Sequence, residues 1–317
     1  MRKQSDFVKP ITEDLHEVLD PEENQGEGEF KTKNPATNRW QRTKVHVENK
    51  KSKFNKTVEM ALCVHGYEEE NQKQPMSLVV FRLHFSCGGS SARYKSATVW
   101  FDFYENEGNK EGTQAQPAVV AYAPFNKNAR WNIVKADLRR QIELGGELGA
   151  EYIASLKATA SAQWEIKYEG KYFDEGAANP NYNDKKGITE GVKWDLKAKK
   201  LPDKESSAVE PDILVAILLK RNETSTGGAI PFSMLYDSRL EGGLQHDIMQ
   251  GIHRILVPWK PEDEAIYFDP TLPDHVFGDD GVRCYEVVSK YKYKMGELAK
   301  EDMMVGLCGV PGLGAVS

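Results

Sequence analysis

The chain has 317 residues, of which 39% are hydrophobic and 28% charged, which is enough for a packed core under a polar surface. Its net charge of −6 argues against a general nucleic-acid binder, because such proteins usually carry a basic excess. No run of about 18 apolar residues is present, which excludes a transmembrane helix, and the first residues lack the apolar core of a signal peptide. We therefore expect a soluble, intracellular (cytoplasmic) protein.

Four cysteines, Cys63, Cys87, Cys284 and Cys308, are spread along the chain without a CxxC pair. They are too sparse for a disulfide framework. We expect all four to be reduced, as in an intracellular protein.

Residues 1–40 are polar, contain Pro10, Pro21 and Pro35, and include the acidic stretch DPEENQGEGEF. This composition predicts a flexible N-terminal arm. We expect at most one short helix in it, near residues 11–19.

From residue 41 onward, short segments rich in valine and aromatic residues alternate with polar loops. The predicted strands are 57–66, 76–87, 96–105, 116–125, 129–138, 190–199, 211–221, 230–239, 251–259 and 281–293. The predicted linkers are 105–116, 174–187 and 260–281, which are rich in Gly, Pro, Asn and Asp. Helices are predicted only at 240–250 and 295–304.

About ten strands with turn signals between them predict an all-β fold, mainly an antiparallel β-sandwich with a few short helices. We expect the sandwich domain to span residues 41–294. Residues 295–317 would follow it as a short helix and an apolar, Gly-rich tail.

Between residues 143 and 170 the sequence alternates with a period of two. Even positions are apolar or small, as in Leu156, Trp164 and Ile166, and odd positions are mostly polar, with Ile153 as the main exception. Steps of two residues rotate a helix by about 200°, which would scatter the even positions around its axis, and each glycine within 145–149 would cost a helix about 1 kcal/mol. We therefore predict a β-strand whose even side chains are buried.

The unchanged parity constrains how this segment turns. A two-residue hairpin pairs residue i with i+3, which would move the apolar face to odd positions. The segment therefore turns through an odd-length loop or continues as one strand. Because no Gly, Pro, Asn or Asp occurs from Ala150 to Glu169, we expect one long strand that bends and passes from one sheet to the other, with a corner at 145–149.

An alternative is that residues 142–169 form the membrane-inserting hairpin of a pore-forming protein. Such hairpins alternate apolar and polar residues and place aromatic residues at the membrane surfaces, here Tyr152 and Trp164. However, the apolar positions are largely alanine, which suits close packing of two sheets better than contact with lipid. We therefore favour core packing.

Two constellations contain the residue types of catalytic or metal sites. CGGSSA at 87–92 nearly matches the Gly-x-Ser-x-Gly motif around a nucleophilic serine, here Ser90, but a strand follows it instead of a helix, so we expect a hairpin loop. Cys63, His65, His84 and Cys87 together have the residue types of a zinc site. On a strand His84 and Cys87 would face opposite sides, so we expect buried thiols instead.

Further charged and histidine-containing segments have simpler interpretations. His246 and His253 lie seven residues apart without a third ligand nearby, which favours a surface role. The acidic residues 262–264 and 279–280 are candidate calcium ligands, although acidic Gly-containing turns are usually only turns. Lysines in 50–56, 185–186 and 197–200 suit phosphates or an acidic partner, and equally suit solvated edges of a sheet. We predict no catalytic, cofactor-binding or metal-binding residue.

The C-terminal stretch MMVGLCGVPGLGAVS carries no charge. A soluble monomer gains nothing by exposing it, so we expect it to dock as an extended segment onto its own sandwich or onto another subunit. The candidate interaction residues recur every three positions: Leu307, Val310, Leu313 and Val316.

The order of four segments resembles β-rich proteins encoded by filamentous fungi or by a fungal virus. These segments are ATVWFDFYE, AVVAYAPF, VKWDLKAKK and PDILVAILLKR, together with the alternating segment between them. The resemblance implies a fungal or viral origin, and it implies no activity, cofactor or site residue.

Because no catalytic constellation is visible, we expect a non-enzymatic protein that acts through binding or self-assembly, by its sandwich surfaces and its C-terminal tail. One form of this hypothesis is an accessory protein on a larger particle such as a fungal virus capsid. The first alternative is the membrane-acting protein described above. The second is an enzyme whose site is built from residues scattered along the chain.

Overall fold

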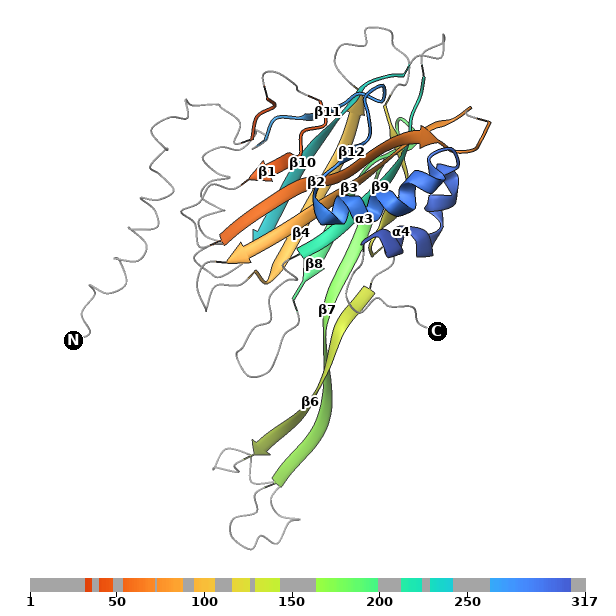
Figure 1. Ribbon diagram of the computed structural model, residues 1–317. Coiled ribbons are helices and arrows are strands. Elements are labelled where there is room, and N and C mark those ends of the chain that lie inside the picture. Colours follow the sequence, from red (N-terminus) through yellow and green to blue (C-terminus); the bar gives the residue numbers. More distant parts are fainter. Residues whose placement is uncertain are drawn as a thin grey trace, which may run out of the picture.

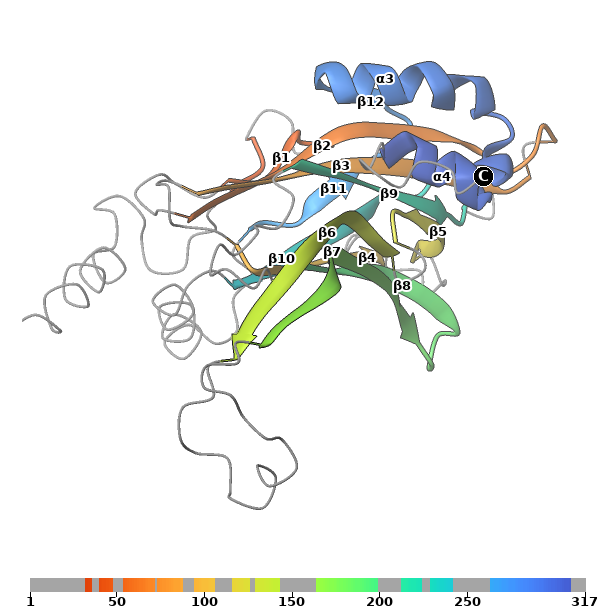
Figure 2. The same cartoon turned by 90° about the horizontal axis from the view of Figure 1, so that it is seen from below.

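The structure is a computed structural model. It describes residues 32–35, 40–47, 54–71, 73–87, 94–105, 116–125, 129–142, 164–198, 212–223, 229–241 and 263–308. Two antiparallel sheets pack face to face, and helices cover the outer face of one of them, so the protein has three layers (Figures 1 and 2). The predicted all-β sandwich with a few short helices is confirmed.

Sheet 1 has the strand order β1-β2-β3-β9-β5, and β12 pairs with β2. Its strands are β1 (Lys44–Val47), β2 (Phe54–Tyr67), β3 (Pro75–Cys87), β5 (Ala118–Ala123), β9 (Asp212–Lys220) and β12 (His275–Val276). All of these pairings are antiparallel.

Sheet 2 has the strand order β11-β10-β4-β8-β7-β6, and it too is antiparallel throughout. Its strands are β4 (Ser96–Glu105), β6 (Ala129–Ile142), β7 (Trp164–Asn183), β8 (Ile188–Lys197), β10 (Phe232–Glu241) and β11 (Ile266–Phe268). β6 is the last strand of the order, so it forms one edge of the sheet.

The core between the sheets follows from period-two alternation. In β4 the residues Ala97, Val99, Phe101 and Phe103 are buried while their neighbours along the strand are partly exposed. Aromatic rings fill much of this layer, and Phe101 stacks on Phe81 of sheet 1 with ring centroids 4.4 Å apart. These contacts fix the two sheets against each other.

β9 departs from alternation because both of its faces are covered. Its sequence DILVAILLK is buried from Ile213 to Leu219. Odd-numbered residues of β9 join the core between the sheets, and even-numbered residues join a second core beneath the helices. A continuous apolar run is the expected pattern for a strand buried on both faces.

The helical layer consists of α3 (Gly278–Val288), η1 (Ser289–Tyr291), η2 (Met295–Ala299) and α4 (Glu301–Cys308). Residues 281–293 were predicted as a strand, and that prediction is wrong. Gly281, Cys284 and Val288 recur at helical spacing and are buried against sheet 1, and Asp279 and Asp280 in the first turn complement the helix dipole. Gly281 is required there, since a Cβ atom would overlap the carbonyl oxygen of Ala61.

Other boundaries also differ from the predictions. Residues 174–183, expected in a linker, continue β7, and only 184–187 form the turn to β8. The linker predicted at 260–281 contains β11 and β12. The expected helix at 295–304 is present as η2 and α4, broken near Lys300. The expected helix at 11–19 and strand at 251–259, and most of the expected helix at 240–250, lie outside the described residues.

The first part of the C-terminal tail packs on its own sandwich. Residues up to Cys308 are helical instead of extended, and Met304, Leu307 and Cys308 are buried in the core beneath the helices. Of the two grooves that the sequence allowed, Leu307 therefore occupies the one within the chain. Val310, Leu313 and Val316 lie outside the described residues.

Replacing Leu307 by alanine should lower the free energy of unfolding by about 2–5 kcal/mol, because it leaves a cavity between α4 and sheet 1. Thermal and denaturant unfolding measure this change. The control is Val287→Ala on α3, where Val287 is 37% exposed, and its effect should be small. Equal melting of both variants would contradict the described docking of α4.

Candidate functional site

The zinc ligands that the sequence suggested do not converge. Cys63 and His65 lie in the core between the sheets, with Sγ and Nε2 3.5 Å apart. His84 lies on the opposite face of sheet 1, where its Nδ1 contacts Asp212 at 3.0 Å. The side chain of Cys87 is outside the described part. Among the described residues no group of three or more His, Cys, Asp or Glu residues is arranged to hold a metal ion.

His65 is a neutral, buried histidine in a complete hydrogen-bond network. Its Nε2 accepts from the Gln41 side-chain amide at 2.9 Å, and its Nδ1 donates to the Ser77 hydroxyl at 2.7 Å. Burial, together with the smaller effect of the positive charges of Arg221 and Lys292, lowers the pKa of His65 to about 3. The network therefore stabilises the neutral ring, and both of its nitrogen atoms are hydrogen-bonded within the protein.

A second buried pair joins β1 to the segment before β11. His46 Nδ1 lies 2.6 Å from Asp263 Oδ2, and both side chains are almost fully buried. His46 Nε2 and Asp263 Oδ1 have no hydrogen-bond partner among the described residues. Separating such a pair leaves buried polar groups without their partner, so the pair holds the β1 edge of sheet 1 in place.

Two further candidate groups contain described residues with structural partners. The sequence suggested either a phosphate or acidic partner or a solvated sheet edge for the lysine groups. Lys56 has neither role, because it is buried and donates to Ser238 at 3.0 Å. The candidate calcium ligands are separated, because Asp263 contacts His46 and Glu264 accepts from the backbone of Asn34.

CGGSSA lies between β3 of sheet 1 and β4 of sheet 2, so it connects the two sheets and is not the expected hairpin loop. Ser90, His246 and His253 lie outside the described residues.

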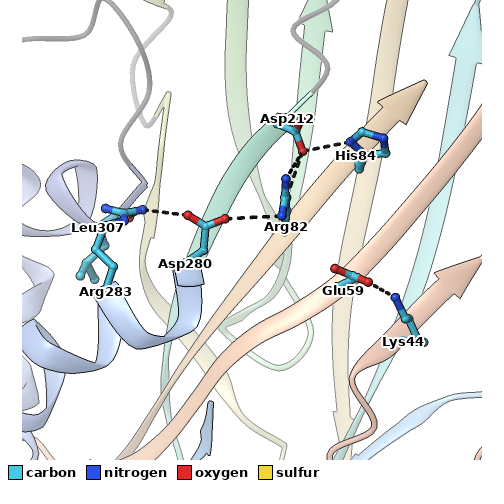
Figure 3. A network of polar contacts seen from close by, with 8 residues as sticks. All are labelled: Lys44, Glu59, Arg82, His84, Asp212, Asp280, Arg283 and Leu307. Atoms are coloured by element: carbon cyan, nitrogen blue, oxygen red, sulfur yellow. Dashed lines mark hydrogen bonds and ion pairs between the residues drawn. The ribbon is translucent and has the colours of Figure 1, made fainter. Parts of the chain in front are cut away.

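A surface network ties the helices to sheet 1 (Figure 3). Asp212 accepts from Arg82 at 2.9 Å and from His84 at 3.0 Å, and Asp280 lies 3.9 Å from Arg82 and 3.6 Å from Arg283. Partial burial favours a higher pKa for Asp212, but the hydrogen bonds from His84 and Arg82 outweigh it and lower the pKa. Arg283 also donates to the Leu307 carbonyl at the end of α4. The network therefore connects α3 with α4 and, through Asp280 and Arg82, with sheet 1.

The outer face of sheet 2 is likewise satisfied by its own residues. Asp195 accepts from Thr98 at 2.9 Å and pairs with Lys193, whose Nζ lies 5.6 Å from the centre of the Trp100 ring. Asn181 donates to Asp102 at 3.0 Å. This surface is therefore a self-paired polar face.

Among the described residues, a two-stranded ribbon at the edge of sheet 2 extends beyond the paired strands of the sandwich. β7 pairs with β8 only from Glu175 onward, whereas β6 pairs with β7 as far as Trp164. We call residues 129–142 and 164–174 the ribbon. It projects beyond the end of the sandwich (Figures 1 and 2), and a β-bulge between Trp131 and Val134 lies near its base.

The ribbon corrects the predicted course of the alternating segment. β6 and β7 are antiparallel neighbours in one sheet, so the chain reverses between Ile142 and Trp164 and does not cross to the other sheet. The connection 143–163 has an odd number of residues, as the other alternative required, and it lies outside the described residues. Residues 164–170 are strand, as predicted.

The register divides the ribbon into two chemically distinct faces. From Val134↔Tyr172 to Ile142↔Trp164 it pairs even with even and odd with odd residues, and successive residues belong to opposite faces. The even rows are apolar except for Arg140: Val134–Tyr172, Ala136–Gly170, Leu138–Tyr168, Arg140–Ile166 and Ile142–Trp164. The odd rows are charged or polar: Lys135–Lys171, Asp137–Glu169, Arg139–Lys167 and Gln141–Glu165.

The odd rows pair like charges across the two strands. Lysine faces lysine, aspartate faces glutamate and arginine faces lysine, and each such pair disfavours a strand pairing by a few tenths of a kcal/mol to about 1 kcal/mol. The sign of the charge reverses from one odd row to the next. The ribbon also has open edges, because within the described strands β6 has no second neighbour and β7 has none from 164 to 174.

Sequence reasoning found the apolar parity of residues 164–170 in β7, and it missed the parity of β6 and the charge pattern of the ribbon. The like-charge rows depend on which residue of β6 faces which residue of β7, and the turn between them carries no Gly, Pro, Asn or Asp signal after Ala150. Once a register is known, the rows follow from the sequence alone.

No protein-family model matches this sequence, and no curated protein matches it either. The resemblance to fungal proteins therefore stays a sequence-based expectation. In the part of the chain that the structure describes, no helix is long and apolar enough to span a membrane.

The lowered pKa of His65 predicts acid sensitivity. Between its ordinary pKa of about 6.5 and the folded value of about 3, only the unfolded chain binds this proton, so the free energy of unfolding falls as the pH drops through that window. The expected slope is about 1.4 kcal/mol per pH unit. His65→Gln should therefore flatten the decline in melting temperature between neutral pH and pH of about 4.5.

The two proteins are compared by the slope of melting temperature against pH, because the substitution also changes packing and hence the melting temperature at every pH. His84→Gln, on the surface, is the matched control and should keep the acid-dependent decline that His65 causes. A His65→Gln variant as acid-sensitive as the unmodified protein would contradict this role.

Proposed function

We propose that this protein is a non-enzymatic assembly protein whose copies associate edge to edge through the β6–β7 ribbon. The observation that carries this proposal is the like-charge pairing of three consecutive odd rows within one ribbon. Like-charge pairs do not stabilise a single ribbon. They can stabilise the contact between two neighbouring ribbons, because the rows of opposite charge can then face each other.

The gain depends on how far the neighbours are shifted along their strands. Without a shift, Glu169 of one copy would lie beside Asp137 of the next, and like charges would meet again. A shift of two residues in one direction pairs Glu169 with Lys135, Lys167 with Asp137 and Glu165 with Arg139 of the next copy. A shift of two residues in the other direction also pairs opposite charges, for example Lys171 with Asp137.

Closure of a sheet into a ring supplies such a shift. Tilted strands in a closed sheet are staggered, and in the eight-stranded example the stagger is about one residue per strand. A two-stranded repeat is therefore shifted by about two residues from the next, which is the value that the charges favour. The two open edges are different strands, so copies pair head to tail, and this geometry closes into a ring when the rotation allows it.

Main-chain pairing supplies the attraction, and the charges select the register. The outer edge of β6 can add to the free edge of β7 of the next copy by strand addition. A lone two-stranded ribbon is marginally stable in water, so the additional strands also stabilise the ribbon itself.

Three further observations support this proposal. His65, His46 and Lys56 are buried and paired internally, which favours a structural role for these three residues over a catalytic one. Cys63, Cys284 and Cys308 are free and buried, which supports an intracellular location. α4 packs within the chain, so the assembly surface that we propose is the ribbon, with the tail beyond Cys308 as an additional candidate contact.

The substitution Asp137→Lys should have opposite effects on the stability of one ribbon and on the association of copies. Within one ribbon the new lysine faces Glu169, so the ribbon should be more stable, whereas between shifted copies it meets Lys167 or Lys171, so association should weaken. Size-exclusion chromatography with light scattering at low ionic strength should show a loss of affinity of about two- to thirtyfold per contact, because one attractive pair becomes repulsive and each is worth about 0.2–1 kcal/mol.

The matched control is Asp279→Lys, which makes the same change of charge on an exposed residue of α3 and should assemble normally. High salt should weaken assembly of the unmodified protein, because it screens the charge rows. A monomeric unmodified protein, or equal assembly of both variants, would contradict the proposal.

A further inference from the structure

We propose that the apolar face of the assembled ribbons binds the acyl chains of a lipid bilayer, so that the assembly inserts into membranes. This inference rests on the proposed assembly. It concerns only the ribbon rows from Val134–Tyr172 to Ile142–Trp164, whose register the structure describes.

Closing the ribbons into a ring leaves two faces, one inside and one outside. The odd rows are charged or polar without exception, and the even rows contain four apolar or small pairs and the mixed pair Arg140–Ile166. The charged odd face is the face in contact with water, whether it lies inside or outside the ring. The choice is therefore between an apolar interior packed on itself and an apolar exterior that meets lipid.

Arg140 decides between these two arrangements. If the even face were inside, every copy would bring one Arg140 toward the axis, and the even rows contain no carboxylate to pair with it. Several arginines would then meet in a small apolar space, at a high cost in desolvation and repulsion. Outside, an arginine close to the edge of the apolar band reaches phosphate groups of lipid headgroups.

The position of Arg140 fits the edge of such a band. It is one even row away from Ile142–Trp164, and tryptophan and arginine together are typical of the interface between acyl chains and headgroups. Tyr172 occupies the row at the opposite end. Aromatic residues thus occupy both ends of the apolar face, as in strands that cross bilayers.

The height of the band also agrees. From Tyr172 to Trp164 the strand advances eight residues, about 27 Å at about 3.4 Å per residue. A tilt of about 40° reduces this to about 20 Å, close to the apolar band of about 25 Å that membrane-crossing strands present.

Site-directed labelling tests the two faces separately. In the full-length chain with Cys87→Ser, single cysteines are introduced on the even face (Ala136→Cys and Leu138→Cys) and on the odd face (Lys135→Cys and Gln141→Cys) and labelled with a polarity-sensitive dye. The other native thiols are buried. Vesicles of phosphatidylcholine and phosphatidylserine, with and without nitroxide-labelled acyl chains, are then added.

We expect blue-shifted emission and nitroxide quenching at 136 and 138, and neither change at 135 and 141. Release of a trapped dye should be lost in Leu138→Glu and retained in Gln141→Glu, which adds the same charge to the other face. Assembly without vesicles is measured on the same proteins by light scattering.

Normal assembly without a lipid response at 136 and 138 would overturn this inference and leave the proposed assembly standing. An equal response on both faces would also overturn it, because the odd face has no reason to meet acyl chains. If the unmodified protein does not assemble at all, the proposed function and this inference are both overturned.

Discussion

Sheet 1 has to bury both of its faces, and the rest of the structure depends on that requirement. β9 and β3 carry apolar residues on either side, so one face needs sheet 2 and the other needs α3, η2 and α4. The order of layers follows directly, and so does the fate of the C-terminal segment. α4 is needed to close the second core, in which Met304, Leu307 and Cys308 are buried.

Sheet 2 has the complementary property. It buries one face against sheet 1, and its other face is a polar surface whose residues pair with one another. Its β6–β7 edge runs beyond the sandwich, where no described element supplies a partner for the apolar rows. A ribbon with apolar rows and like-charge rows gains stability from association, and the proposed contacts with further copies and with lipid supply it.

Three buried polar residues stabilise the sandwich. His65 contacts Gln41 and Ser77, His46 contacts Asp263, and Lys56 contacts Ser238. Such contacts hold the edges of sheet 1 in one register, and the cost of breaking them is high because the freed groups would remain buried. His65, His46 and Lys56 therefore serve the packing of the sandwich.

The sequence by itself determined the all-β class, eight of the twelve described strands within a few residues, and the apolar parity of residues 164–170 in β7. These properties are local, because a period of two is set by the backbone of a single strand. Tertiary structure decided the remainder. Residues 281–293 contain the valines and tyrosines of a strand, but the open face of sheet 1 selects a helix that places Cys284 and Val288 against it. The sheet membership of β6 and β7, and with it the pairing of Lys135 with Lys171, depends on contacts between residues far apart in the chain, which no local pattern encodes.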